Sequence, residues 1–137
     1  MASCLESCGM RCGRDGVHAR SLLTEAQRQF VDDDDGFRAL FESLGTRPGS
    51  APDLRRAAAA ASRGRSTFNR DFHLLARRSW HEFVTEWRME TAAAMLRSPF
   101  SRVKEVMRAV GYRSRGSFSN AFLKHHGMRP GAFRRSL

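Results

Sequence analysis

Apolar residues recur along this chain at intervals of three, four and seven positions, which is the spacing of one face of an α-helix. The clearest run predicts an amphipathic helix over residues 36–44, with the apolar positions Phe37, Leu40, Phe41 and Leu44. A weaker stripe predicts a short helix over residues 21–31. No segment alternates apolar and polar residues over a useful length, so the sequence predicts an all-α fold.

Aspartate, glycine and proline residues mark where these helices are expected to begin and end. The four aspartates of residues 32–35 repel one another, which breaks the first helix, and they favour the positive N-terminal end of the next. Residues 45–50 are a turn-rich connector, and Pro52 is expected in the first turn of an alanine-rich helix over residues 54–61. A long helix is expected over residues 79–97, because Pro99 cannot continue it.

An eight-residue segment recurs with a period of 50 residues. Residues 65–72 read RSTFNRDF and residues 115–122 read RGSFSNAF. A repeat of this length predicts two copies of one supersecondary unit. In each copy a basic and polar start is followed by two phenylalanines four positions apart, so one helix face is expected in a core and the front end is expected to meet something polar.

Helix boundaries around the second copy follow from capping residues. Ser101 and Ser114 are expected to cap two helices, over residues 101–110 and 115–126. Gly127 is expected to end the second of these in the left-handed conformation. The first copy is expected to form the corresponding helix over residues 65–76.

Charge divides the chain into two unequal parts. The formal net charge is +10, but residues 1–50 carry a net −2 and residues 51–137 a net +12. A basic helical half is typical of proteins that bind a polyanion, most simply nucleic acid. A solvated basic surface with no partner is the alternative, and charge alone does not separate the two.

The first residues of the chain predict neither a membrane span nor an enzyme centre. No apolar run is long enough for a transmembrane helix and no signal-peptide pattern is present, so a cytoplasmic location without membrane contact is expected. Cys4, Cys8 and Cys12 are spaced by four residues, with His18 as a conceivable fourth zinc ligand, but the spacing fits zinc knuckles poorly. Reduced thiols are expected there, with no metal and no cofactor.

A short helix, a tight break and a second helix with a polar outer face together form a helix-turn-helix. In that motif the N-terminal residues of the second helix meet base edges in the major groove. An ordinary helical hairpin whose polar face is exposed only to solvent would explain one such unit. Two units with the same face polarised, in a half of net charge +12, favour DNA binding.

Residues from about 51 to 136 resemble the DNA-binding domain of the AraC/XylS family of bacterial transcription regulators. The resemblance rests on five segments: RMETA at 88–92 with Met95-Leu96, VMRAVGY at 106–112, SFSNAF at 117–122, GMRP at 127–130, and Phe133-Arg134. It implies seven helices in two homeodomain-like helix-turn-helix subdomains joined by a linker helix. The two recognition helices would enter successive major grooves about 34 Å apart.

The resemblance also implies a division of the chain. Residues 1–35 are expected to be an N-terminal segment, partly disordered, and residues 36–137 the DNA-binding domain. Within that domain we expect four parts: a first helix-turn-helix at about 51–78, the linker helix at 79–97, a second helix-turn-helix at 101–127 and a terminal helix at 130–135. Only about 50 residues precede the motif, too few for the sensor domain of most relatives, so no small-molecule effector is expected.

Candidate DNA contacts are carried over from the family by position. The expected base readers are Ser66, Asn69 and Arg70 in the first unit and Arg115, Gly116, Ser117, Ser119 and Asn120 in the second. The expected phosphate contacts, which fix register without reading sequence, are Arg65, Arg113 and Arg134. His73 lies on the reading arc, whereas His125 and His126 are expected to be helix-end residues without chemistry.

Several positions depart from the family pattern. The family usually has an apolar residue and a capping serine where this chain has Arg63-Gly64, and glycine where it has Arg77. In the family, arginine is common at the position where this chain has Asn120. Asp71 places a negative charge near the first reading face. The first unit is therefore expected to be looser or differently specific.

These observations predict a non-enzymatic, sequence-specific regulator of transcription, acting as an activator, with double-stranded DNA and RNA polymerase as partners. One alternative is a non-specific or truncated DNA-binding remnant. The other is DNA-repair alkyl transfer through an N-terminal cysteine, although no general base accompanies Cys4, Cys8 or Cys12.

Overall fold

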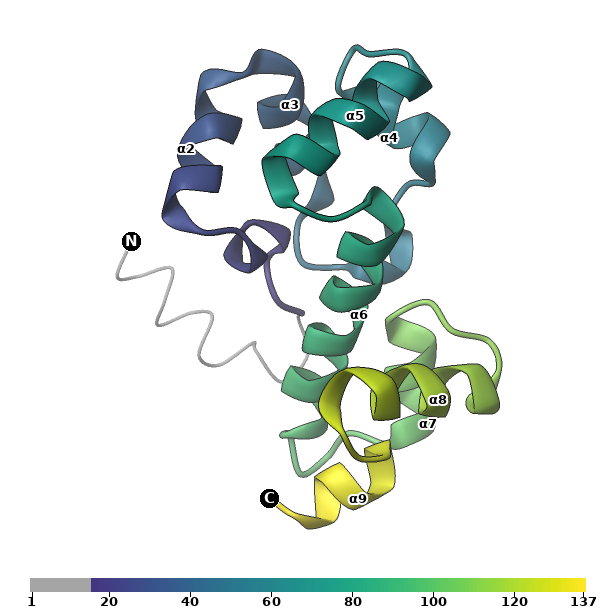
Figure 1. Cartoon of the computed structure of the whole chain (residues 1–137). Helices are drawn as coiled ribbons and strands as arrows, with labels where there is room; N and C mark the ends of the chain where they lie inside the picture. The colour runs from purple at the N-terminus through teal and green to yellow at the C-terminus, as the bar shows by residue number, and fades with distance from the viewer. Residues whose placement is uncertain (1–15) are drawn as a thin grey trace.

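The computed structural model describes residues 16–137, and every regular element in this part of the chain is helical (Figure 1). The prediction of an all-α fold is therefore confirmed. The 3₁₀-helices are η1 (Ala19–Leu22) and η2 (Pro48–Ser50). The α-helices are α2 (Glu25–Asp33), α3 (Asp35–Leu44), α4 (Leu54–Ala60), α5 (Arg65–Ala76), α6 (Trp80–Leu96), α7 (Val103–Ala109), α8 (Arg115–His126) and α9 (Pro130–Arg135).

The long helix α6 joins two hydrophobic cores. Its first part, through the fully buried Trp87, packs with α2, α3, α4 and α5. Its second part, from the fully buried Met89 onward, packs with α7, α8 and α9. Figure 1 shows α6 running from the upper group of helices into the lower one. The expected pair of helix-turn-helix units joined by a linker helix is thus confirmed, and the linker belongs to both cores.

Residues 17–33 pack against the first unit and do not form a separate segment before residue 36. Ala19, Leu23 and Val31 are buried in the same core as Phe37 and Phe72. The expected boundary between residues 35 and 36 therefore does not coincide with a gap in the packing. Spacing alone could not show this, because the stripe of residues 21–31 does not specify what it packs against. Residues 1–15, with Cys4, Cys8 and Cys12, lie outside the described residues.

The chain at Val17 is fastened to the middle of α6. The Trp87 indole Nε1 donates to the Val17 carbonyl at 2.5 Å, and the Val17 amide donates to Thr91 Oγ1 at 3.2 Å. Thr91 is the one buried polar residue in the described part of the chain, and this bond satisfies its hydroxyl. Val17, which lies in the segment expected to be partly disordered, therefore contributes to the joint between the two units.

Helix ends follow the predicted capping pattern in most places. Ser114 caps α8 by accepting from the Ser117 amide at 3.3 Å, and Gly127 ends it with φ 81°. Arg77 ends α5 in the same left-handed region, with φ 63°, where glycine would carry no steric penalty. Gly64 is the N-cap of α5 and supplies no side-chain hydrogen bond. Helix α5 therefore lacks both the side-chain N-cap and the C-terminal glycine of α8.

The predicted starts of two helices are wrong. Arg102, not Ser101, is the N-cap of α7, and the Ser101 hydroxyl instead donates to the Ser98 carbonyl at 3.0 Å, which closes the preceding turn. Asp53 caps α4 through the Arg56 amide at 2.9 Å, so Pro52 lies outside the helix. In both places the helix begins one or two residues later than predicted, which is the usual uncertainty of a helix boundary read from local sequence.

The first helices of the two units and their second helices are separated by different numbers of residues along the chain. The helices α4 and α7 are related by 49 residues, and α5 and α8 by 50, so the second turn contains one more residue. Ser62, with φ 58°, accordingly matches Gly111, with φ 98°. This places Arg63 at the turn position where the second unit has the half-buried Tyr112.

Within residues 16–137, no helix combines the length and the apolar character that a membrane crossing requires.

Candidate DNA interface

In each unit the second helix of the pair presents its first two turns to solvent while its phenylalanines are buried. On α5 the four expected contacts are all exposed: Arg65, Ser66, Asn69 and Arg70. Phe68 and Phe72 of the same helix are completely buried and stack on each other at 5.6 Å between ring centroids. The aromatic residues are thus core residues, as expected, and the polar arc is free to contact a ligand.

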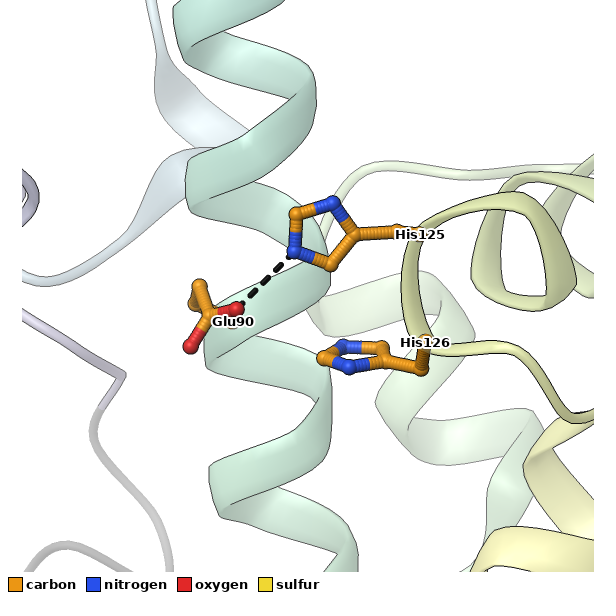
Figure 2. A group of neighbouring side chains, drawn as sticks. All are labelled: Glu90, His125 and His126. Carbon is orange, nitrogen blue, oxygen red and sulfur yellow. Dashed lines mark hydrogen bonds and ion pairs between the residues drawn. The ribbon is translucent and has the colours of Figure 1, made fainter.

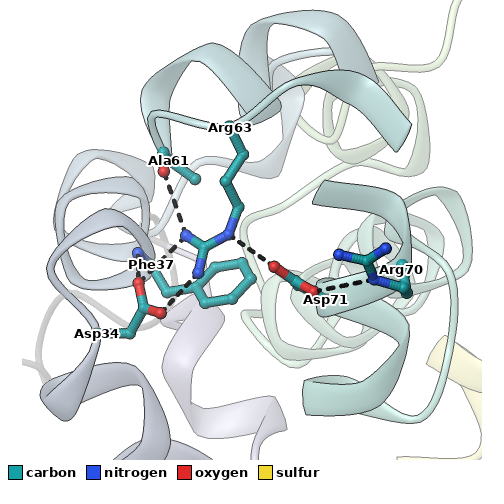
Figure 3. A network of polar contacts seen from close by, with 6 residues as sticks. All are labelled: Asp34, Phe37, Ala61, Arg63, Arg70 and Asp71. Carbon is teal, nitrogen blue, oxygen red and sulfur yellow. Dashed lines mark hydrogen bonds and ion pairs between the residues drawn. The ribbon is translucent and has the colours of Figure 1, made fainter. Parts of the chain in front are cut away.

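An ion-pair network fixes the turn that precedes α5 (Figure 3). Arg63 Nη2 lies 2.6 Å from Asp34 Oδ2, and Arg63 Nε lies 3.0 Å from Asp71 Oδ2. The guanidinium also lies over the Phe37 ring, 4.3 Å from its centroid. Arg63 therefore fills the position expected to be apolar, with its charge satisfied by one carboxylate from the α2–α3 junction and one from α5 itself.

These contacts shift ionisation in the expected directions. The hydrogen bond from Arg63 holds the pKa of Asp34 below its ordinary value, against the opposing effect of partial burial. Asp34 in turn raises the pKa of Arg63 above its ordinary value. Both groups are therefore charged near neutral pH.

Asp71 connects this network to the reading arc. Its second oxygen, Oδ1, lies 3.5 Å from Nε of Arg70, whose side chain remains 70% exposed. The acid expected to weaken the first reading face is thus engaged by Arg63 and lies beside an expected base reader. Figure 3 shows this contact between Asp71 and the Nε of Arg70.

The corresponding arc of α8 is exposed at four of its five expected base readers. Arg115, Gly116, Ser117 and Asn120 are exposed. Ser119 differs, because it is half-buried and its hydroxyl accepts from Arg129 Nη1 at 2.9 Å. Ser119 is therefore committed, at least through that oxygen, to the turn between α8 and α9.

The expected phosphate contacts lie at the edges of these helices. Arg65 and Arg113 are exposed, at the first residue of α5 and in the turn before α8. Arg134 is half-buried and donates to the Pro99 carbonyl at 3.0 Å. A surface depression between α8 and α9 is lined by Arg115, Arg129 and Arg135 among others, which concentrates positive charge beside the start of α8.

Comparison with known proteins assigns the domain. The family model described as a helix-turn-helix domain matches residues 57–136. A protein of Streptomyces antibioticus described as an AraC-like transcription regulator is 35% identical over 78 residues, and one of Streptomyces lividans with the same description is 39% identical over 54 residues. The chain belongs to the AraC/XylS helix-turn-helix family.

The two alignments cover a larger share of this chain than of the AraC-like relatives. The alignments cover 57% and 39% of this chain, but 26% and 18% of the AraC-like relatives, so this chain matches only about a quarter or less of their length. The solved C-terminal domain of AraT, a response regulator from Geobacillus stearothermophilus, has a TM-score of 0.60 and covers 90% of this chain and 88% of that one. At 23% identity it supports the AraC-type fold.

In this AraC/XylS domain most acidic residues of the basic half have structural roles. Asp53 and Glu82 cap helices, Asp71 pairs with Arg63, and Glu86 pairs with Arg78 at 2.8 Å. Within residues 16–137, by contrast, no carboxylate lies within ion-pair distance of Arg65, Arg113 or Arg115. The positive charges of these three arginines at the starts of α5 and α8 are therefore not neutralised by a neighbouring carboxylate of the described residues.

Sequence reasoning missed three features of this AraC/XylS domain. It did not predict the ion pairs of Arg63, the bond from Arg129 to Ser119, or the contact of His125 with Glu90. The first and third join residues 29 and 35 positions apart, which local spacing cannot reveal. An arginine at an apolar family position was the only available signal for the first.

Proposed function

We propose that this chain is a sequence-specific double-stranded-DNA-binding transcription regulator, with α5 and α8 each inserted in a major groove. The observation that carries the proposal is the repeated arrangement at the two ends of α6. In each unit a buried pair of phenylalanines fixes one face of the second helix, and its first turns present exposed polar and basic residues. An α-helix fits the major groove, and a single chain with two such helices can read a bipartite site.

The second unit is proposed to provide the stronger base discrimination. Arg115 can donate two hydrogen bonds to guanine, and Asn120 can pair with adenine through its amide. Neither is engaged by another side chain in the described part of the chain, and Ser114 and Gly127 fix both ends of their helix. In the first unit Arg70 is ion-paired with Asp71, which leaves its guanidinium less free to contact a base.

The remaining elements of the proposal come from the family. We propose activation of transcription through contact with RNA polymerase, a cytoplasmic location and no bound effector. Double-stranded DNA is the partner that the unpaired arginines at the starts of α5 and α8 would neutralise.

The test is selection of binding sites from random duplex DNA, followed by affinity measurements on the selected and a random duplex at fixed salt. We expect a specificity ratio of about 10³ or more, as for specific regulators. Arg115→Ala and Asn120→Ala should each relax the preference at one base, by about 1–3 kcal/mol. Arg38→Ala is the matched control. It also removes an arginine, but Arg38 lies on α3, outside the two proposed reading helices, and is paired with Asp35.

The outcomes separate specific from non-specific binding. If the two α8 variants keep the preference of the unsubstituted chain, α8 does not read bases. If the ratio is near one for every selected duplex, the chain binds DNA without sequence specificity. Each phosphate contact should add about −0.9 to the slope of log affinity against log salt, so Arg65→Ala and Arg113→Ala should each make the slope less steep by about one unit.

A further inference from the structure

Three side chains that commonly bind metal ions meet where the end of α8 contacts α6. Glu90 comes from the middle of α6, and His125 and His126 are the last two residues of α8 (Figure 2). One ligand atom from each lies within 4.8 Å of the other two. The cluster lies away from the first turns of α8, where the expected DNA contacts are located, and the proposed function leaves it without a role.

The hydrogen bonds of the cluster resemble those around a bound metal. His126 Nε2 lies 2.9 Å from the Met89 carbonyl oxygen. Because a carbonyl can only accept, Nε2 carries the proton in this contact, and Nδ1 keeps the lone pair with which a neutral imidazole binds a metal. Metal-binding histidines usually donate their other N–H group to a carbonyl or carboxylate in this way, which fixes the ring and its tautomer.

Packing holds the His126 ring in place before any ion binds. The His126 ring lies between Phe122 and Phe133, at 4.4 Å and 5.8 Å between centroids. Glu90 follows Met89, which is completely buried, so the backbone that carries its carboxylate is part of the second core. The side chains of His125 and Glu90 are 27% and 42% exposed, and His125 Nε2 lies 2.9 Å from Glu90 Oε2. Side-chain motion alone can therefore adjust the donor atoms around an ion.

We propose that Glu90, His125 and His126 bind one divalent transition-metal ion of the zinc class, which pins the end of the second recognition helix to the linker helix. Two imidazoles and a carboxylate are a donor set typical of zinc, with a fourth position for water. Tetrahedral zinc separates its donor atoms by about 3.3 Å, from bonds of about 2.0 Å. The short contact between Glu90 and His125 would open slightly, and the ion would replace its shared proton.

A metal-free explanation of the same contacts exists. A protonated His125 would pair with Glu90 and with the negative end of the helix dipole, and His126 would simply fill space beside Phe122. That explanation predicts no measurable affinity for zinc above that of an unrelated surface histidine. The proposal does not depend on DNA binding, so it can fail or succeed independently of the proposed function.

The experiment is calorimetric titration of the full-length chain with Zn²⁺. Cys4, Cys8 and Cys12 are first replaced by serine, because thiols could bind zinc themselves. In this background we expect one equivalent of Zn²⁺ to bind and to raise the melting temperature. Glu90→Gln and His125→Ala should each weaken the binding about tenfold or more, and abolish most of the melting-temperature rise.

Two further variants make the result decisive. His81→Ala removes an exposed histidine from α6 outside the cluster and should leave both the affinity and the stoichiometry unchanged. His126→Gln keeps a donor toward the Met89 carbonyl while removing the imidazole, and circular dichroism confirms that each variant folds. The proposal is overturned if the serine background binds no zinc, or if Glu90→Gln and His125→Ala bind it as tightly as His81→Ala does.

Discussion

Arg63 shows how one charged side chain can replace an apolar residue in a helix-turn-helix. Its guanidinium lies on the Phe37 ring and is bonded to Asp34 and Asp71, so both its flat surface and its polar edge are satisfied. Removing one partner of such a part-buried pair is costly, because the other charge stays desolvated. The aspartate at position 34 also accepts from the Phe37 amide at 3.0 Å, which caps α3.

The charge of Asp34 should stabilise the fold only above acidic pH. Asparagine caps helices about as well as aspartate, so Asp34→Asn removes the charge and retains a cap. We expect the variant to lower the free energy of unfolding by about 1–2 kcal/mol at pH 7, with Arg63 still paired to Asp71. Because folding lowers the pKa of Asp34, its contribution is complete above the unfolded value near 4 and is lost as pH falls through the folded value.

Urea unfolding between pH 7 and pH 3 measures this difference. The gap between the original chain and Asp34→Asn should narrow below about pH 4. Glu25→Gln, at an exposed position in the first turn of α2, is the control and should show a much smaller effect at pH 7. A gap that stays constant down to pH 3 would contradict the ion-pair assignment.

At the scale of the elements, local sequence predicted most helices and few of their partners. Residues 36–44, 65–76 and 115–126 were predicted within one residue of α3, α5 and α8, because their apolar spacing and terminal residues agree. The packing of α2 and η1 against the first core could not be predicted, since one amphipathic stripe fits any apolar surface. The cluster of Glu90 with the end of α8 was unpredictable for the same reason.

Helices α5 and α8 differ at both ends in a way that stability measurements can detect. Arg77→Gly should raise the free energy of unfolding by about 1 kcal/mol, because glycine adopts φ 63° without a steric penalty. Gly64→Ser should add a few tenths of a kcal/mol as a capping residue, since a Cβ at position 64 meets no atom within 4 Å. Thermal and urea unfolding measure both.

Matched variants isolate the backbone effect. Arg77→Ala removes the same side chain but keeps the left-handed penalty, so it should give little gain. Gly127→Ala should lower the free energy of unfolding by about 1 kcal/mol, because alanine is strained at the φ of 81° found at position 127. An added Cβ there meets no atom within 4 Å, so the loss would come from the backbone conformation and not from a collision. Equal effects of Arg77→Gly and Arg77→Ala would assign the gain to the lost charge and not to the helix end.

At the scale of the whole molecule, the two units are less independent than the repeat suggests. They share α6, and the segment at Val17 bonds to Trp87 in the first core and to Thr91 beyond it. The η2 turn also contacts α6, where Arg88 Nε donates to the Pro48 carbonyl at 3.3 Å. The sequence indicated two copies of a unit, but these joining contacts come from outside the repeat.

Residues 16–31 should therefore be required for full stability. A fragment of residues 32–137 loses the buried side chains of Ala19, Leu23 and Val31 and exposes part of the first core. We expect its free energy of unfolding to be lower than that of residues 16–137 by about 3 kcal/mol, the cost of removing a few buried apolar side chains. Equal urea midpoints for the two fragments would show that the segment adds no stability.

The continuity of α6 restricts which insertions and deletions the domain can accept. A helix turns by about 100° and advances by about 1.5 Å for each residue. One residue inserted between Trp87 and Met89 would therefore swing α8 about 100° around the axis relative to α5, so the two could no longer face one side of a duplex. The loop between α6 and α7 lies outside this shared helix and can change length at lower cost. Under the proposed function, the distance between the two half-sites is a property of one uninterrupted helix, and related proteins should keep its length while their loops vary.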